Sequence, residues 1–152
     1  MDPPSSAAGD FDNDGDTDFV LNFGTLFLGN QKESVTMFNL KRHIRCEPQV
    51  ARGGVAQVEL YADAGHIVAP VLSFAPASTS LGDLGRLMID PTSTIPLPIA
   101  FFASQGRIDR PVPIPNDPAF AGWIVYSQGI DLWDEAGVPK AHLTNVTQFR
   151  IQ

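Results

Sequence analysis

The chain has 152 residues, 43% of them hydrophobic, which is enough for one domain with a real core, or one domain with a small appendage. Its formal net charge of −7 argues against nucleic acid as a partner. The single cysteine, Cys46, excludes an intrachain disulfide, and no apolar run approaches a membrane span, so we expect no membrane insertion. The 13 glycines and 13 prolines favour many short strands over helices.

The chain begins with residues 1–9, MDPPSSAAG, which we expect to form a flexible leader. This stretch has neither the basic region nor the apolar region of a signal peptide. The start of the chain therefore says little about the compartment in which the protein works.

An acidic stretch follows, GDFDNDGDTDF, with an aspartate at every second position. The five members are Asp10, Asp12, Asp14, Asp16 and Asp18. Carboxylates this close repel one another unless a cation lies among them, and Ca²⁺ accepts six to eight oxygen ligands in irregular geometry. Asp10, Asp12 and Asp14 match places 1, 3 and 5 of a calcium loop, and Gly15 stands at the sixth place, where the turn needs a positive φ.

We therefore predict that the five aspartates form a Ca²⁺ site, with Asp16 supplying its main-chain carbonyl and Asp18 a direct or water-mediated ligand. Mg²⁺ suits the loop less well, because it keeps several waters and few protein ligands. The alternative is a solvated acidic turn that binds nothing.

The loop is not an EF-hand, because the twelfth place holds Leu21 instead of Glu and the flank FVLNF has the pattern of a strand. The stretch DFDNDGDTDFVLNFG resembles the calcium loop of FG-GAP repeats, the blades of integrin-type propellers. The resemblance covers residues 9–38, and one repeat cannot close a propeller.

Apolar stretches and turn residues after the loop predict two or three short strands, within residues 19–28 and 34–39. These strands are candidates to add to the sheet of a neighbouring molecule. We divide the chain into an acidic calcium-loop segment, residues 1–40, and a β-sandwich domain, residues 41–152.

The second segment carries strand patterns at intervals of about ten residues, which predicts an all-β fold, an antiparallel sandwich or jelly-roll-like domain. Residues 55–62 alternate between an apolar and a polar face. In HIVAPVLSFA, Pro70 predicts an edge strand or a bulge. Further alternation predicts strands over 124–132 and 143–151.

Residues 106–151 resemble the C-terminal β domain of many large secreted or surface proteins of bacteria. The matching residues are Pro113, Ile114, Pro115, Asn116, Pro118, Gly122, Gln128, Leu143, Thr144 and Asn145, with Gly85, Leu87, Asp90 and Pro91 upstream. Phe120 stands where an aliphatic residue is more usual. The resemblance implies a secreted β-sandwich module at the cell surface or outside the cell, and it implies no reaction.

Four residues of this motif have a structural interpretation. Asn116 or Asp117 is expected to hydrogen-bond its own turn in a rigid crossover between sheets. Gln128 and Asn145 fall among apolar residues, and we expect each to satisfy main-chain groups at a bend instead of binding a ligand.

No catalytic constellation emerges, and we do not expect an enzyme. His43, His66 and His142 lack the spacing of a metal site, so solvated or hydrogen-bonded positions are expected for them. His43 and Cys46 would point to opposite faces of an extended segment, and no G-x-S-x-G motif occurs.

A second acidic cluster, Asp131, Asp134 and Glu135, reads as an exposed hairpin loop and leaves a minor second cation site open. Trp133 in the same stretch either stacks on a sugar or packs against a neighbouring loop. Trp123 begins a strand and is expected in the core.

These patterns together predict a non-enzymatic, extracellular, calcium-binding β-sandwich module for adhesion or self-assembly. Its expected partners are further copies of the chain, in an oligomer or a surface polymer formed by strand exchange. The alternative is a carbohydrate-binding module with a glycan partner.

Overall fold

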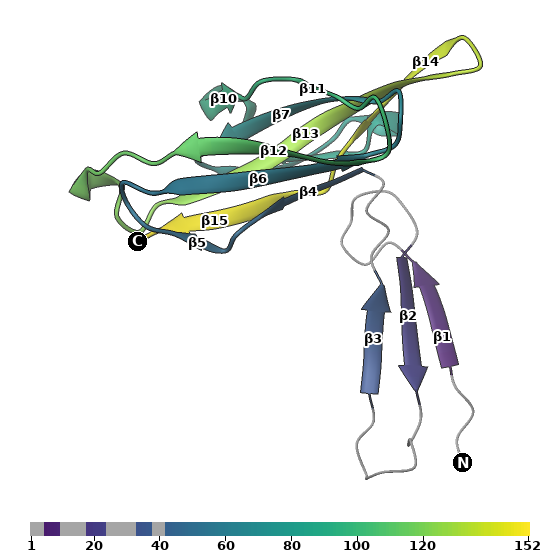
Figure 1. The fold of residues 1–152 in the computed structure, drawn as a ribbon, viewed down its shortest axis with the longest axis horizontal. Helices are drawn as coiled ribbons and strands as arrows, with labels where there is room; N and C mark the ends of the chain where they lie inside the picture. Colours follow the sequence, from purple (N-terminus) through teal and green to yellow (C-terminus); the bar gives the residue numbers. More distant parts are fainter. Residues whose placement is uncertain (1–4, 10–17, 24–32, 38–41) are drawn as a thin grey trace.

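The computed structural model describes residues 5–9, 18–23, 33–37 and 42–152 (Figure 1). The prediction of an all-β fold is confirmed, because strands dominate every described part of the chain. The helices of the described residues are three short 3-10 turns: η1 (Gly82–Leu84), η2 (Pro91–Ser93) and η3 (Pro118–Phe120).

An N-terminal sheet contains β1 (Ser5–Gly9), β2 (Asp18–Phe23) and β3 (Glu33–Met37) in the antiparallel order β1-β2-β3. Within the leader expected to be flexible, residues 5–9 instead form the strand β1, and each of them pairs with β2; the rest of that leader lies outside the described residues. The expected domain boundary after residue 40 lies in 38–41, outside the described residues.

The rest of the chain forms a β-sandwich-like body. Its smaller sheet has the order β12 (Gly106–Pro113), β6 (Val55–Ala62), β4 (Arg42–Cys46). Its larger sheet has the order β10 (Thr94–Pro96), β7 (Ile67–Ser73), β13 (Ile124–Glu135), β15 (Thr147–Ile151), β5 (Gln49–Val50), with β11 (Ala100–Phe101) paired to β7 and β14 (Val138–Leu143) paired to β13. The pairing of β15 with β5 is parallel.

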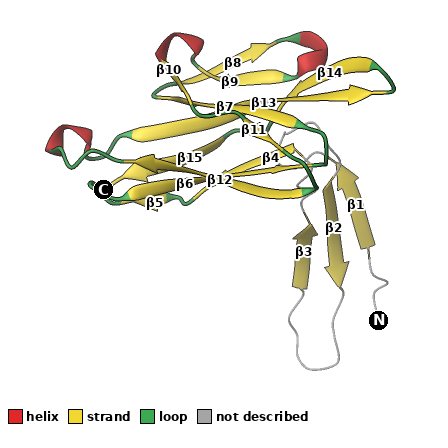
Figure 2. Ribbon diagram, turned by 45° about the horizontal axis from the view of Figure 1, so that its top comes forward, coloured by secondary structure: helices red, strands yellow, loops and turns green. Residues whose placement is uncertain are grey.

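A separate hairpin of β8 (Pro76–Ser80) and β9 (Arg86–Ile89) completes the body. Figure 2 shows this hairpin above β7 and β13, on the side away from β6 and β12. The larger sheet is thus covered on one face by the smaller sheet and on part of the other face by the hairpin.

The core lies between the two sheets and follows the alternation expected from the sequence. On β6, Ala56, Val58, Leu60 and Ala62 are buried, and the residues between them are more exposed. The larger sheet contributes buried apolar residues from three strands, among them Val68, Leu72, Val125, Phe149 and Ile151. Burying these side chains is the main favourable term in folding the body.

The sequence context of Pro70 predicted an edge strand or a bulge. In the structure, Pro70 does not lie on an edge strand. It pairs with Gly129 inside the larger sheet, and its carbonyl accepts a hydrogen bond from the Leu97 N–H (3.0 Å). The main-chain polar groups of Pro70 therefore face the break between β10 and β11. The ladder of hydrogen bonds is interrupted there, so the N–H that proline lacks costs little stability.

The strand expected over residues 143–151 is two strands separated by a break at Thr144–Val146. Both pair with β13: β15 pairs with its residues 124–127 and β14 with its residues 130–135. At the break, the Gly129 N–H donates to Thr144 Oγ1 (2.9 Å), and the Thr144 N–H donates to the Gly129 carbonyl (2.9 Å). Because of the interruption, the long strand β13 pairs with both β15 and β14.

Candidate functional sites

The predicted calcium loop connects two paired strands. Gly9, at the end of β1, is the register partner of Asp18, at the start of β2. Asp10, Asp12, Asp14 and Asp16 lie outside the described residues, so their mutual geometry remains a prediction from spacing. Within the described ranges, no group of three or more His, Cys, Asp or Glu residues is arranged to hold a metal ion.

The strand β2 distinguishes the predicted calcium loop from an EF-hand. Leu21, at the twelfth place, lies within β2, where an EF-hand would have a helix. The loop is therefore followed by an extended strand, as the sequence predicted.

The second acidic cluster is not an exposed loop, which corrects the expectation from the sequence. Asp131, Asp134 and Glu135 all lie on β13, and the turn itself is Ala136-Gly137, with φ of 55° and 81°, the signature of a tight type I′ hairpin. Successive residues of a strand point to opposite faces, so Asp131 and Asp134 diverge.

Each acidic group at this hairpin has a structural partner. Asp134 Oδ1 accepts a hydrogen bond from the Gly137 N–H (2.7 Å), which holds the turn. Glu135 lies 3.7 Å from Lys140 across the hairpin, in an exposed ion pair. Asp131 is fully buried. These three carboxylates do not converge on one point, and no second cation site forms from them.

Asp131 contacts His66, a pairing that sequence reasoning missed. His66 Nδ1 lies 2.8 Å from Asp131 Oδ2 and 3.0 Å from Oδ1. The Trp133 ring stacks on the imidazole with centroids 5.3 Å apart and planes 2° apart. Asp131 and Trp133 lie two residues apart on β13, so both face the inner side of the sheet toward the His66 end of β7.

A buried carboxylate that orients a histidine is also the pair found behind nucleophiles in hydrolases. Among the described residues, however, no hydroxyl or thiol group hydrogen-bonds to His66. The contact with His66 gives the buried Asp131 carboxylate a polar partner at the end of the sandwich. The expectation that the histidines occupy hydrogen-bonded positions is confirmed for His66.

The other two histidines also contact neighbouring groups. His142 Nδ1 lies 2.6 Å from the Leu143 carbonyl oxygen. The His43 ring contacts the edge of the Tyr61 ring, with centroids 6.4 Å apart. Cys46 lies on the buried face of β4, opposite to the face of His43, as predicted.

The Cys46 thiol is held in its less reactive, protonated form. Burial and, to a smaller extent, the nearby Glu59 carboxylate raise the pKa of this thiol to about 12, against the lowering effect of a hydrogen bond with Thr147. A thiolate is the reactive form of cysteine, so Cys46 is not suited to act as a nucleophile.

The two amides singled out in the sequence hold the body together, as predicted. Asn145 Oδ1 accepts from the Ile44 N–H (2.7 Å) and its Nδ2 donates to the Ile44 carbonyl (3.0 Å). Gln128 Oε1 accepts from the Met88 N–H (2.8 Å), and Nε2 donates to the carbonyls of Arg86 and Thr144 (both 2.9 Å). Both side chains are buried and serve main-chain groups of other segments.

The loop between β12 and β13 also behaves as expected. Asp117 Oδ1 accepts a hydrogen bond from the Ala119 N–H (2.9 Å) and caps η3. The loop thereby leads from the smaller sheet to the larger one, as the alternating prolines predicted.

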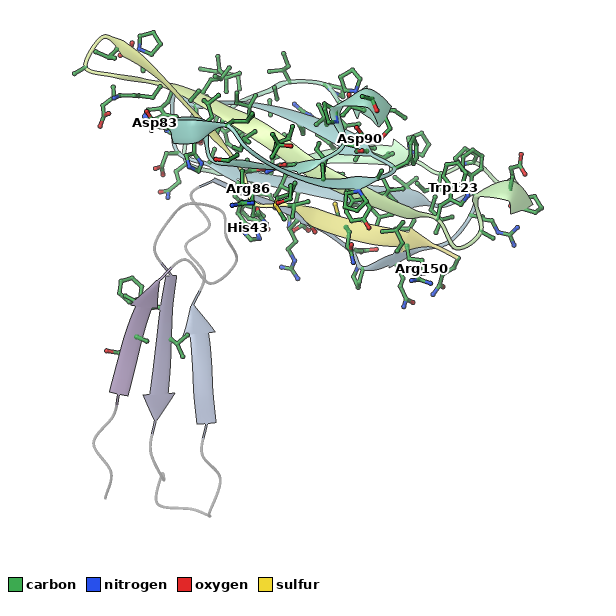
Figure 3. All side chains as sticks on the ribbon, turned by 180° about the vertical axis from the view of Figure 1, so that it is seen from behind. His43, Asp83, Arg86, Asp90, Trp123 and Arg150 are labelled. Carbon is green, nitrogen blue, oxygen red and sulfur yellow. The ribbon has the colours of Figure 1, made fainter. Side chains whose placement is uncertain are left out.

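Of the two tryptophans, Trp133 packs against a neighbouring residue, which was one of its two expected roles, and Trp123 does not lie in the core. Trp133 is half-buried against His66, whereas Trp123, expected in the core, is 42% exposed. Trp123 lies at the end of the body opposite to the β14 hairpin (Figure 3). The rings of Phe74 and Phe120 meet it edge-to-face, at 5.3 and 5.1 Å. Because Phe74 is also exposed, these residues form an aromatic surface cluster.

One shallow cleft lies beside the β8–β9 hairpin. Its volume is about 170 Å³, and Met88, Tyr126 and Val146 are among its mostly apolar lining. Pockets for cofactors and drug-sized ligands usually measure about 300–1,000 Å³. The cleft is too small for such a ligand.

Comparison with protein-family models finds no match for this chain, and a search of curated proteins finds no relative. Among the described residues, no helix has the length and apolar character needed to cross a membrane.

Proposed function

We propose that the protein is a non-enzymatic, extracellular β-sandwich module whose N-terminal sheet is stabilised by Ca²⁺ and which takes part in adhesion or self-assembly. The observation that carries the proposal is the aspartate spacing of residues 10–18, in a loop that joins the paired ends of β1 and β2. A cation there would relieve the repulsion of the carboxylates and tie the hairpin together.

The distribution of charge supports this assignment. Residues 1–40 contain seven acidic residues and one lysine, a net charge of −6, which leaves −1 for residues 41–152. The excess of negative charge is therefore concentrated around the loop. The resemblance to the FG-GAP calcium loop is consistent with the same assignment, and the resemblance of residues 106–151 to bacterial secreted domains supports the extracellular setting.

Calorimetric titration of the full chain with CaCl₂ tests the metal site. We expect binding with a dissociation constant of about 10⁻⁴–10⁻³ M, the range of extracellular calcium modules. Asp14→Ala removes the central predicted ligand and should abolish the binding heat. Asp83→Ala, in the first turn of η1, is a matched control and should bind Ca²⁺ as the wild type does.

The assembly part of the proposal has its own test. Electron microscopy and size-exclusion chromatography with Ca²⁺ and with EDTA should show larger species in Ca²⁺. Wild-type protein that titrates with no heat would overturn the calcium proposal, and protein that stays monomeric in both conditions would overturn the proposed assembly.

A second candidate function is glycan binding at the aromatic cluster of Trp123, Phe74 and Phe120. The observation that favours it is the exposure of Trp123 beside a second exposed ring, since aromatic faces stack on sugar rings. A polysaccharide pull-down should lose its signal in Trp123→Ala and keep it in Trp133→Ala. Equal retention of both variants would reject this site.

A further inference from the structure

Several contacts along the edges of the smaller sheet oppose strand addition. On β12, Pro111 and Pro113 lack an N–H, and Arg110 donates to the carbonyls of Pro98 and Ile99 (both 2.9 Å), which ties this edge to the connection between β10 and β11. On β4, the Asn145 side chain occupies both main-chain groups of Ile44. A neighbouring strand would have to displace these contacts.

The larger sheet instead presents an apolar row on its outer face. Phe101 on β11 pairs with Ile67 on β7, Ile67 pairs with Leu132 on β13, and Leu132 pairs with Ala141 on β14. Directly paired residues lie on the same face, so these four residues form one continuous line across four strands, here called the apolar row. Phe101 is 62% exposed, and Ile67 and Leu132 are each 37% exposed.

On the same face, the apolar row is flanked by apolar residues along β7 and by Asp134 beyond Leu132 on β13. Ala69 and Val71 follow Ile67 on that face, and Ala69 pairs with Ile130. The solvated face of an antiparallel sheet normally carries polar residues. The β8–β9 hairpin covers this face only farther along, where it meets Gln128.

We propose that a second copy of this chain covers the apolar row, so that two larger sheets pack face to face. The apolar row would be the contact face for the self-assembly proposed above, so the inference rests on that part of the proposed function. A two-fold axis would set the row against itself, which suits a self-complementary apolar surface. Strand exchange at the smaller sheet is not needed for this contact.

The area of the row agrees with such a contact. With an aromatic side chain contributing about 150–250 Å² when fully exposed, the row and its apolar neighbours present roughly 300–400 Å². A standard interface buries about 800 Å² on each partner, of which somewhat more than half is apolar. The row therefore supplies most of the apolar part that one stable dimer requires.

Sedimentation velocity over a concentration series tests the inference, with the full chain in Ca²⁺ and in EDTA. The variants are Phe101→Lys and Leu132→Lys, and Val55→Lys is the matched control, because Val55 is an exposed apolar residue on the smaller sheet. We expect a wild-type dimer whose dissociation constant rises by at least about 30-fold in the row variants, as for residues central to an interface. Val55→Lys should match the wild type.

Phe101→Lys decides the outcome if Leu132→Lys does not fold, since Phe101 is the more exposed residue, and circular dichroism reports folding. A wild-type monomer at every concentration overturns the inference, and so does a dimer that both variants retain. Assemblies that both row variants retain reject the apolar row alone, whereas calcium heat from a protein that stays monomeric rejects the row and the proposed assembly and leaves the calcium site. A dimer lost in Phe101→Lys without any calcium heat rejects the calcium proposal alone.

Discussion

The N-terminal sheet and the sandwich body differ in what holds their strands together. The body buries a continuous cluster of apolar side chains between two sheets and adds buried amides that join separate segments. The N-terminal sheet has three short strands that pair with no strand of the body. Small sheets of this kind are marginal in water unless something else stabilises them.

The two regions also differ in net charge. Residues 1–40, with the N-terminal sheet, carry nearly all of the net negative charge, and residues 41–152, with the core, are close to neutral. In the body, ionisable groups pair with neighbours, as Arg107 does with Glu59 (3.3 Å) and Asp109 (3.0 Å). The body folds on apolar burial, whereas the proposed calcium site would make the stability of the N-terminal sheet depend on the Ca²⁺ concentration.

The largest effect is expected from the core of the body. Phe149→Ala removes a ring that is almost fully buried and should lower the free energy of unfolding by about 3–5 kcal/mol. Urea denaturation monitored by tryptophan fluorescence measures this, because Trp123 and Trp133 both lie in the body.

Phe19→Ala is the matched control in the other region, since Phe19 is exposed on β2. It should leave the urea midpoint of the body unchanged. A shift as large as that of Phe149→Ala would mean that the two regions unfold as one unit, and the comparison would fail.

A smaller loss is expected from the amide that joins β4 to the break before β15. Asn145→Ala leaves the N–H and carbonyl of Ile44 without their partners in a buried place, which should cost about 2 kcal/mol in the free energy of unfolding. Urea denaturation again gives the value. Gln148→Ala, at an exposed position of β15, provides the control, and equal midpoints for the two variants would contradict the bridging role.

The last effect is absent near neutral pH and concerns Cys46 in alkaline solution. Its pKa is raised to about 12 in the folded state, from 9.0, so the folded protein holds the proton more tightly than the unfolded chain. The resulting stability is present below about pH 9 and is lost as the pH rises toward 12. Cys46→Ala should flatten this loss in thermal melts between these limits.

The rate of labelling by a thiol reagent measures independently how far the fold protects the Cys46 thiol. Below pH 9, Cys46 should react slowly in buffer and quickly in urea, because the folded state keeps the thiol buried and protonated. Equal labelling rates in buffer and in urea would show that the β4 edge opens readily.

Much of the fold was predictable from local patterns, and the failures have a common cause. The alternation of β6, the roles of Gln128 and Asn145, and the strand after the acidic loop were all predicted. The expected exposed loop at Asp131 was wrong, because Ala136-Gly137 alone makes the turn and β13 runs on to Glu135. The expected core position of Trp123 was also wrong, since the strand pattern does not tell which strand ends reach solvent.

The sequence by itself determined that the chain is rich in short strands, that negative charge gathers in one segment, and that the aspartates have the spacing of a calcium loop. These properties depend on neighbours along the chain, where the period of a strand and the spacing of ligands can be read directly. The tertiary structure alone decided that His66 meets Asp131, 65 residues away, and that four strands align their apolar residues in one row. Both depend on the register between distant strands, which no local pattern specifies, because many registers satisfy the same alternation.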